Sequence, residues 1–524
     1  MTTGLSKSRL MSYQQCDRKL WLSVHGPELA AVSDSNQARF DQGNEVGEFA
    51  RREAEKSFGA ATLIDVRPHG WKEGVRLCEE ALARAGVQVL FEAPFIGGGI
   101  GVLVDIVVRA ADGALTLVEV KSSTSLKGKP YVDDAAVQAW TMTAAGHAPD
   151  RVVLRLLDSS WVYQGDGDYG GLFKDINVTT EVQARFEKMP ELVRKAQLTL
   201  EGMEPQTEPG KHCSKPFACG FGAHCQAWDA ARKRPLPRNP VGMLLRRNMG
   251  TFTRAEKKAL KGGTYADLSD LPETFPEDER TRAIVRSLRE GKAWASGDLV
   301  KLLAAVPYPR YHFDFETIAF AVPRWKATRP YQQVPFQWSC HVEHGDRTVE
   351  HHEYLDISGD DPREECARKI VELMGKTGDG VVVVYSQSFE ETRLKELARD
   401  FPEHAAGLKR VIARLVDLLP VFREHYFHPD LDASWSIKKV LPTVASELDY
   451  ANLTEVQDGG GAQRAYLEAI ASIDLRRKAE VSERMLMYCG RDTEAMLRLI
   501  RVAEKPLSQL DVGRRVQLLR VRWL

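Results

Sequence analysis

The sequence lacks an excess of charge of either sign, an uninterrupted apolar run of membrane-spanning length and any repeated or low-complexity segment. Its 72 Lys and Arg residues balance 73 Asp and Glu residues, for a formal net charge of -1. This balance excludes a global basic field that would draw the protein to nucleic acid, so any such site must be local. The apolar stretch 87–108 contains Glu92, Asp105 and the glycines 97–99, which favours a β-hairpin over a membrane helix. The first sixteen residues hold no apolar core of signal-peptide length. We therefore expect a cytoplasmic protein with no membrane partner.

The chain does have the length and composition of a multidomain globular protein. Its 524 residues exceed one ordinary core, and 43% hydrophobic and 28% charged residues are typical of soluble proteins. Strand and helix patterns alternate up to about residue 230 and again from about residue 306, with short helical pieces between. We predict an α/β protein with domains over 1–230 and 306–524, joined by a small helical connector over 231–305. The predicted strands are 87–92, 101–109, 115–121, 151–157, 310–316, 336–342 and 380–385, and the predicted helices are 133–145, 180–200 and 253–261.

A first pair of carboxylates is predicted in a hairpin over residues 101–121. Ala111-Asp112-Gly113 suits a three-residue loop that ends in a left-handed glycine. That loop places Asp105 opposite Glu119, with Cβ atoms about 5 Å apart, and puts Lys121 on the same face. Two carboxylates suit Mg²⁺ or Mn²⁺, and a lysine beside them can stabilise developing negative charge. The alternative is a solvent-facing hairpin with a Glu–Lys pair.

A second pair lies on a predicted strand that carries Asp314 and Glu316, which are two residues apart and so share one face. Far downstream, Tyr488 and Asp492 are four residues apart on a predicted helix whose apolar stripe points inward. An inward Asp is costly without a partner, and a metal ion held jointly with Asp314 and Glu316 would satisfy it. The alternatives are a charge pair at a strand end and a solvated helix residue.

Three of the eight cysteines have a regular spacing. Cys213, Cys219 and Cys225 form a C-x5-C-x5-C pattern in a loop with Gly and Pro, which suggests ligation of a soft metal. Disulfides are not expected in a cytoplasmic protein, and unliganded buried thiols are the plain alternative. Cys78, Cys340, Cys366 and Cys489 lie within predicted elements, and we expect them to be packed or partly exposed free thiols.

The first half resembles RecB-like nucleases of the PD-(D/E)xK superfamily, above all the iron–sulfur type of CRISPR adaptation modules. The resemblance rests on residues 5–10 (LSKSRL), residues 16–21 (CDRKLW) and the carboxylate motif, and covers about 5–226. It implies a restriction-endonuclease-like fold, with Asp105 and Glu119 as metal ligands, Lys121 as the catalytic lysine and Gln138 as the following helical glutamine. It also implies a 4Fe–4S cluster on Cys16, Cys213, Cys219 and Cys225, for which a structural zinc site is the alternative. The sequence departs from the family at Gly47, where a metal-binding His is usual, so that Glu45 or Glu48 would replace it, and at Met142, where Tyr is frequent.

The second half resembles DEDD exonucleases of the DnaQ-like, RNase H-like fold that carry Tyr in the third motif, over roughly 308–505. It is similar in particular to uncharacterised domains fused to RecB-like nucleases, which share the phrases Asp-Phe-Glu-Thr and Tyr-Cys-x-x-Asp-Thr. The resemblance implies that Asp314, Glu316, Glu390 and Asp492 bind two Mg²⁺ or Mn²⁺ ions, with Glu390 in place of the usual Asp. Tyr488 would orient the attacking water.

The two resemblances together predict a metal-dependent nuclease with two active sites. It would degrade or trim single-stranded DNA ends in repair, end processing or defence against foreign DNA. The alternatives are an RNA exonuclease and a nucleic-acid-binding or scaffold module with one or both sites inactive. Lys438 and Lys439 are candidate phosphate contacts, and Tyr331, Phe336 and Trp338 are candidates for base stacking, against solvated and core-packed alternatives.

Overall fold

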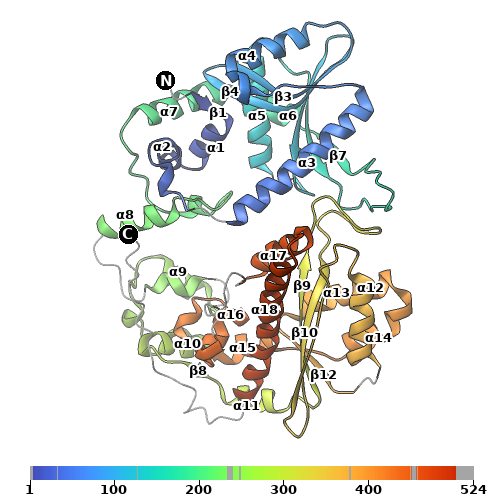
Figure 1. Ribbon diagram of the computed structural model, residues 1–524. Coiled ribbons are helices and arrows are strands. Elements are labelled where there is room, and N and C mark those ends of the chain that lie inside the picture. The colour runs from blue at the N-terminus through green and yellow to red at the C-terminus, as the bar shows by residue number, and fades with distance from the viewer. Residues whose placement is uncertain are drawn as a thin grey trace. The chain divides into compact units, whose positions relative to one another are not determined.

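Two sheets organise the chain, and each belongs to a different unit of the computed structural model (Figure 1). Unit 1 comprises Met1–Pro235 and Phe320–Gln332, and unit 2 comprises Leu236–Ala319 and Gln333–Leu524. The structure describes residues 4–31, 34–126, 128–232, 240–246, 249–376, 379–448, 450, 456 and 458–502, with the backbone alone at 34–40 and 230–232. No helix among these residues combines the length and the apolar character needed to cross a bilayer.

Unit 1 contains a mixed seven-stranded sheet in the order β2-β3-β4-β5-β6-β7, with β1 also paired to β4. The pairs β3–β4, β4–β5 and β6–β7 are antiparallel, and β1–β4, β2–β3 and β5–β6 are parallel. The strands are β1 (Leu5–Ser6), β2 (Thr62–Leu63), β3 (Gln88–Gly97), β4 (Ile100–Arg109), β5 (Leu115–Lys121), β6 (Arg151–Leu157) and β7 (Phe173–Asn177). The predicted strands 101–109, 115–121 and 151–157 are thus confirmed within a residue.

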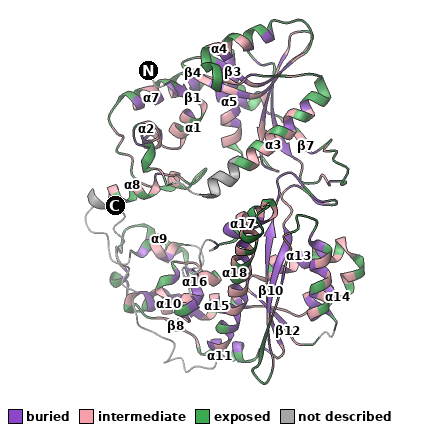
Figure 2. Ribbon diagram, in the orientation of Figure 1, coloured by how far each residue is buried: buried purple, intermediate pink, exposed green. Residues whose placement is uncertain are grey.

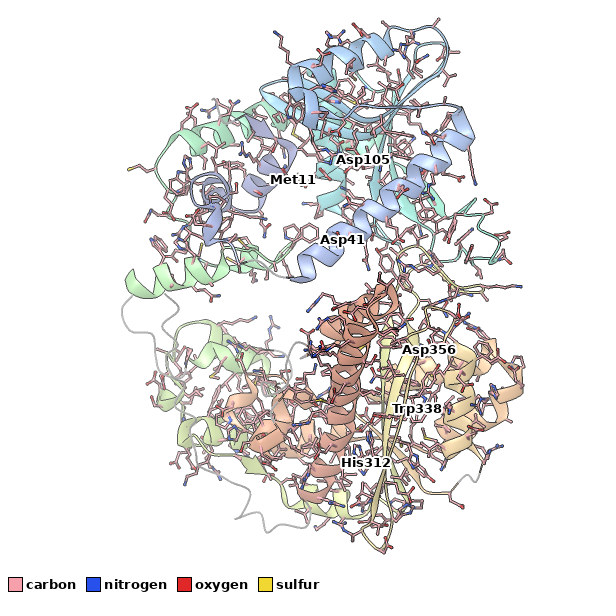
Figure 3. All side chains as sticks on the ribbon, viewed as in Figure 1. Met11, Asp41, Asp105, His312, Trp338 and Asp356 are labelled. Atoms are coloured by element: carbon pink, nitrogen blue, oxygen red, sulfur yellow. The ribbon has the colours of Figure 1, made fainter. Side chains whose placement is uncertain are left out.

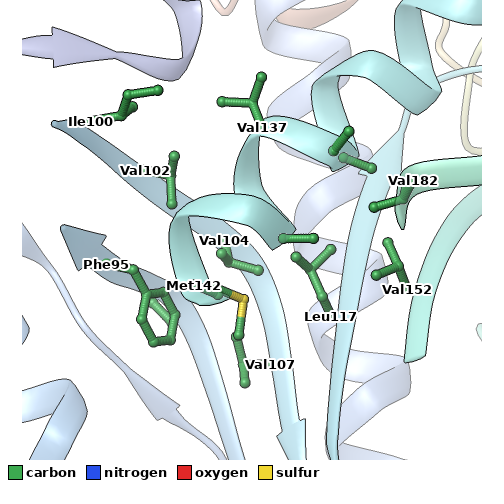
Figure 4. Packing of buried hydrophobic residues seen from close by; sticks show 14 of the residues in the cluster. Phe95, Ile100, Val102, Val104, Val107, Leu117, Val137, Met142, Val152 and Val182 are labelled. Atoms are coloured by element: carbon green, nitrogen blue, oxygen red, sulfur yellow. The ribbon is translucent and has the colours of Figure 1, made fainter. Parts of the chain in front are cut away.

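Helices cover both faces of this sheet. Helix α5 (Lys129–Ala144) lies across one face, where its Val137 and Met142 pack with Val104 and Leu117 of the sheet (Figure 4). Helix α3 (Asp34–Phe58) covers the other face through Ala50 and Ala54. The remaining helices of unit 1 are α1 (Lys7–Gln15), α2 (Asp17–His25), α4 (Val66–Leu82), α6 (Thr179–Gln183), α7 (Met189–Glu201) and α8 (Gly222–Arg232). The predicted helix 180–200 is interrupted, because Pro190 suits the first turn of a new helix and cannot lie in the interior of a continuous one.

The hairpin β4–β5 has the predicted three-residue loop. Ala110 N donates to Ala114 O at 2.9 Å, and Gly113 takes a left-handed φ of 91°. The recorded register runs from Arg109↔Leu115 to Ile106↔Val118, which makes Asp105 and Glu119 the next opposed pair. The turn residues therefore determined the face on which each carboxylate lies.

Unit 2 is built on a five-stranded sheet in the order β11-β10-β9-β12-β13. Strand β9 (Arg310–Ile318) is central, antiparallel to β10 (Val334–Glu343) and parallel to β12 (Val381–Val384). The outer strands are β11 (Val349–Leu355) and β13 (Leu415–Asp417). Buried residues run along β10 and β12, as expected for strands covered on both faces (Figure 2).

One face of the second sheet packs against helices α12 (Arg363–Ile370), α13 (Gln387–Asp400) and α14 (Pro402–Ile412), and the long helix α18 (Leu475–Arg501) crosses the other face (Figure 1). Alternation along β9 sends Phe313 and Phe315 into the core with α12–α14 and leaves Asp314 and Glu316 for the α18 face. Further elements are α9 (Arg254–Lys261), α10 (Glu279–Glu290), β8 (Trp294–Ala295), α11 (Gly297–Ala304), α15 (Leu418–His425), β14 (Tyr426–Phe427), α16 (Ile437–Val440) and α17 (Gly459–Ala471).

The helical pieces predicted as a connector do not form a unit of their own. Val241, Leu268 and Ile284 share one buried cluster with Phe422 of α15 and Leu499 of α18. Residues 236–305 therefore belong to unit 2, because their apolar side chains are too few for a separate core and are buried against its later helices.

Candidate active sites and cysteine site

The first site lies where β4 and β5 separate. Strand β1 pairs with β4 at Ile100 and Gly101, and the pairing of β5 with β4 stops at Ile106. The part of β4 between these two pairings, which includes Asp105, pairs with neither strand. Asp105, which is labelled in Figure 3, is partly buried in unit 1. Its Oδ2 accepts from the backbone N of Val120 at 2.8 Å, which fixes the carboxylate beside Glu119.

All four residues predicted for this site come together. Glu119 is 2% exposed, its Oε1 accepts from Lys121 Nζ at 2.6 Å, and its Oε2 accepts from Gln138 Nε2 at 2.6 Å. Two further residues were not predicted. Asp134 pairs with Lys121, and Lys7 Nζ lies 3.1 Å from Glu119 Oε1 and 3.3 Å from Asp134 Oδ1. Asp134 stands four residues before Gln138 on α5, a spacing that gives both residues the same face and was a usable signal.

Charge in this site is unevenly distributed. Burial, reinforced by Glu119, raises the pKa of Asp105 to about 8. Burial also acts to raise the pKa of Glu119, but Lys121 and Lys7 outweigh it and hold that pKa below its usual range. At neutral pH Asp105 therefore tends to keep its proton while Glu119 is ionised. A divalent cation would have to displace a proton from Asp105 and ammonium groups from Glu119.

Glu45 and Glu48, the two candidates to replace a metal-binding His, form ion pairs with other residues than those of the first site. Glu45 pairs with Arg324 at 3.6 Å, and Glu48 pairs with Arg52 at 2.5 Å on the surface of α3. Met142 packs in the core beneath α5. Within the described residues, the first site therefore offers Asp105, Glu119 and Asp134 as oxygen ligands.

The predicted cysteine ligands are brought together at one end of unit 1. Cys16 lies between α1 and α2, and Cys213, Cys219 and Cys225 lie on the segment that ends in α8. Gln15 Nε2 donates to the carbonyls of His212 and Phe217 at 2.7 and 2.8 Å, so the two segments are joined beside the thiols. Burial raises the pKa of Cys225, with contributions from its three cysteine neighbours. The four sulfurs are thus close enough to interact.

The spacing of these sulfurs bears on what they could hold. Tetrahedral zinc with 2.3 Å bonds needs sulfurs about 3.8 Å apart. Among described residues, one set of three or more ligand atoms lies mutually within 4.8 Å, and the four cysteines are not in it. The other four cysteines are buried free thiols.

The second site is formed by β9, α13 and α18. One ligand atom each of Asp314, Glu316 and Cys489 lies within 4.8 Å of the other two. Glu390 and Asp492 are 2% and 6% exposed, and Oε2 of Glu390 is buried without a hydrogen-bond partner in the described residues. Such an orphaned carboxylate oxygen is costly unless a cation or a proton satisfies it.

Local structure fixes the start of α13, on which Glu390 lies. Asp417, at the end of β13, accepts from the backbone N of Ser386 at 2.9 Å and of Gln387 at 3.0 Å. Ser386 adopts φ 85°, a left-handed turn that redirects the chain from β12 into the helix. Glu390 therefore stands in the first turn of α13.

Mutual repulsion and burial keep these carboxyls partly protonated. Burial raises the pKa of Asp492 to about 6, and burial with the charge of Asp417 raises the pKa of Glu390 to about 8. Burial and the neighbouring carboxylates also raise the pKa values of Asp314 and Glu316 well above their usual range. The site is therefore short of positive charge.

Tyr488 lies in the second site as predicted, with partners that were not. Its hydroxyl oxygen accepts from Lys438 Nζ at 2.5 Å, and Tyr450 donates to Asp492 Oδ1 at 2.5 Å. The sequence predicts Lys438 as a candidate phosphate contact, but nothing in its sequence surroundings indicates Tyr488 as its partner. Tyr450 and Cys489 reach the site by tertiary packing, and no sequence signal pointed to Tyr450.

The candidates for base stacking are occupied elsewhere. Phe336 and Trp338 are 0% and 3% exposed within β10, which makes core packing the correct alternative for both. Tyr331 donates its hydroxyl to the Ser122 carbonyl at 3.0 Å in unit 1.

Comparisons with known proteins match parts of the chain. Residues 311–436 match a family described as "Domain of unknown function (DUF2779)", about a quarter of the sequence. "Uncharacterized protein UU173" of Ureaplasma parvum is 26% identical over 221 residues, 38% of this chain and 31% of that protein. "Uncharacterized protein MG366 homolog" of Mycoplasma pneumoniae is 29% identical over 205 residues, 36% of this chain and 31% of that protein. The matched region thus spans about a third of either relative. A solved structure titled "Crystal structure of SSO0001" matches with a TM-score of 0.26 and 16% identity, over 43% of this chain and 87% of that one.

Proposed function

We propose that the chain is a metal-dependent nuclease with two active sites that hydrolyses phosphodiester bonds at single-stranded DNA ends. The second site carries the proposal, because four carboxyls converge there, three of them buried and that of Asp314 partly buried. One oxygen of Glu390 also lacks a hydrogen-bond partner among described residues. Asp314, Glu316, Glu390 and Asp492 fit divalent cations, which would activate water and neutralise the phosphate. Two features support an RNase H-like, DnaQ-like exonuclease fold for this unit. Strand β9 is central in the sheet, and its alternation puts Asp314 and Glu316 together on the face covered by α18.

The chain's own groups have distinct parts in this proposal. Tyr450 holds Asp492 in one orientation, and Lys438 holds the Tyr488 hydroxyl toward the carboxylates. Burial and Asp492 raise the pKa of Tyr488, so the phenol stays neutral and positions a water or phosphate oxygen by hydrogen bonding rather than acting as a base.

For unit 1 we propose a PD-(D/E)xK, RecB-like nuclease domain with a 4Fe–4S cluster. The convergence of Asp105, Glu119, Lys121 and Gln138 supports the active site. The meeting of Cys16 with the segment that carries Cys213, Cys219 and Cys225 supports the cluster, which would link the N-terminal helices to the end of the domain. Iron and acid-labile sulfide analysis of the purified protein tests it against zinc.

Nucleotide release from 5′- and 3′-labelled single-stranded DNA with Mn²⁺ tests the function. Asp105→Asn and Asp314→Asn each remove one ligand charge at nearly constant shape. We expect each to lower release by at least about 100-fold from the end that its unit degrades, as when a charged transition-state contact is lost. Matched controls are Asp112→Asn and Asp346→Asn, two exposed turn residues.

The outcomes separate the alternatives. Loss of opposite polarities in the two variants supports two exonucleases. Loss in Asp314→Asn alone would make unit 1 a binding module. Full activity in both would overturn the assignment, and faster cleavage of a matched RNA strand would change the substrate.

A further inference from the structure

Lys7 is held at the first site by backbone structure on both sides. It directly follows β1, whose Ser6 pairs with Gly101 of β4, and it begins helix α1, whose first turn is capped by the Ser6 hydroxyl. The far end of α1 reaches Cys16, so the helix that carries Lys7 is also fixed at the cysteine site. The position of Lys7 is therefore set by the fold.

The Lys7 ammonium duplicates the contacts of Lys121. Both ammonium groups contact Glu119 Oε1, at 3.1 Å for Lys7 and 2.6 Å for Lys121, and both pair with Asp134. The Lys7 side chain is 23% exposed, so it is partly buried but open on one side. Glu119 and Asp134 each contact both ammonium groups, so both lysines have a counter-charge as long as these carboxylates hold no metal ion.

A phosphate that arrives with a metal ion would become the new counter-charge of both lysines. A divalent cation bound by Glu119 would displace ammonium groups from that carboxylate and leave two cations near the metal ligands. A phosphodiester brings the negative charge that they lack, and two ammonium groups can contact its oxygens.

We propose that Lys7 is a second phosphate-contacting residue of the first site, which holds the scissile phosphate together with Lys121. The inference rests on the proposed nuclease function of unit 1 and gives a role to Lys7, a residue of the motif LSKSRL to which the sequence analysis assigned none. In this role Lys7 brings a positive charge on a long side chain to the phosphate. Arginine at this position should therefore keep part of the activity, and the uncharged glutamine should not.

The full-length protein in an Asp314→Asn background tests the proposal, because the remaining cleavage then comes from unit 1. Lys7→Gln, Lys7→Arg and Lys121→Gln are compared with Arg9→Gln, which removes a positive charge from the same helix away from the carboxylates. We expect Lys7→Gln to lower kcat/KM at least about 10-fold, Lys7→Arg to restore part of it, and Arg9→Gln to have no effect.

A second readout does not depend on cleavage. Binding of a fluorescent single-stranded oligonucleotide with Ca²⁺ is measured by anisotropy across salt concentrations. Loss of one phosphate contact should lower the slope of log affinity against log salt by about 0.7 in Lys7→Gln but not in Lys7→Arg.

The outcomes distinguish the proposed role of Lys7 from the proposed nuclease function of unit 1. If Lys121→Gln abolishes cleavage while Lys7→Gln changes neither cleavage nor the salt slope, Lys7 is a structural ion pair and the proposal is wrong. If no unit 1 variant changes cleavage, the nuclease function of unit 1 fails, and the salt slope alone decides whether Lys7 contacts phosphate. Equal melting temperatures of Lys7→Gln and Arg9→Gln show that the fold is intact.

Discussion

Protons occupy part of the second site when no cation is bound. Burial raises the pKa of Glu390 to about 8 and that of Asp492 to about 6. A carboxyl whose pKa is raised on folding contributes stability below its unfolded pKa near 4, and that stability is lost as pH rises through the folded pKa. The protein without metal should therefore lose stability as pH rises from about 4 to about 8, first through Asp492 and then through Glu390, and a cation would gain ligands over the same range.

We predict that Mn²⁺ raises the melting temperature of unit 2 more at pH 8 than at pH 6. Each proton that the metal displaces changes its binding free energy by about 1.4 kcal/mol per pH unit, or about 3–6 °C in a unit of this size. Differential scanning calorimetry at fixed Mn²⁺ measures the shift. Glu390→Gln, which cannot ionise, should show a smaller and flatter shift. A Mn²⁺ effect of equal size at both pH values would contradict the assignment of these carboxyls as ligands.

Residues that the sequence predicted and those it missed differ in how they reach the sites. Asp105 and Glu119 were placed correctly because a three-residue turn sets their register locally. Lys7 is 112 residues from Glu119, and Tyr450 meets Asp492 through packing against α18, so no local pattern records either contact. Glu390 was found through a motif, but its orphaned oxygen is visible in the structure alone.

At the scale of elements, helix α18 is anchored on the sheet by a buried ion network as well as by apolar packing. Glu343 of β10 is fully buried and accepts from Arg501 of α18 at 2.9 Å and from Arg310 of β9 at 3.2 Å. Burial acts to raise the pKa of Glu343, but His312 and Arg501 outweigh it and lower that pKa to about 2. His312 is labelled on β9 in Figure 3. The network therefore holds the end of α18 on the sheet, and Tyr488 and Asp492 lie earlier on the same helix.

We predict that Glu343→Gln destabilises unit 2 by about 3–5 kcal/mol, because it leaves the buried Arg310 and the partly buried Arg501 without their counter-charge. The melting temperature should fall by roughly 10 °C. Glu350→Gln on neighbouring β11 is the matched control, since Glu350 is 61% exposed and its ion pairs are worth little. Equal melting temperatures for the two variants would show that apolar packing alone holds α18.

At the scale of the whole molecule, the chain enters unit 1 twice. Residues Phe320–Gln332 follow β9 and precede β10, yet they pack within unit 1. Ala321 and Val322 join the buried cluster of Val46, Leu157 and Leu172, and Tyr163 exchanges backbone hydrogen bonds with Ala327 and Thr328. Strands β9 and β10 of the second sheet are thus linked through a segment of the first unit. Sequence periodicity could not show this arrangement, because the segment has no regular secondary structure.

This topology predicts that a change between two strands of unit 2 destabilises unit 1. Val322→Asp buries a charge in the cluster with Val46 and Leu172, and should cost more than about 3 kcal/mol. Hydrogen–deuterium exchange of the full-length protein should quicken in peptides around residues 46, 157 and 172 and stay slow in β12. Val349→Asp is the matched control, because Val349 is 39% exposed on β11. Local unfolding follows the contacts that a segment makes rather than its place in the chain, so exchange should quicken in unit 1. Faster exchange in unit 2 alone would contradict the prediction, because it would mean that Phe320–Gln332 stabilises the unit that flanks it in sequence.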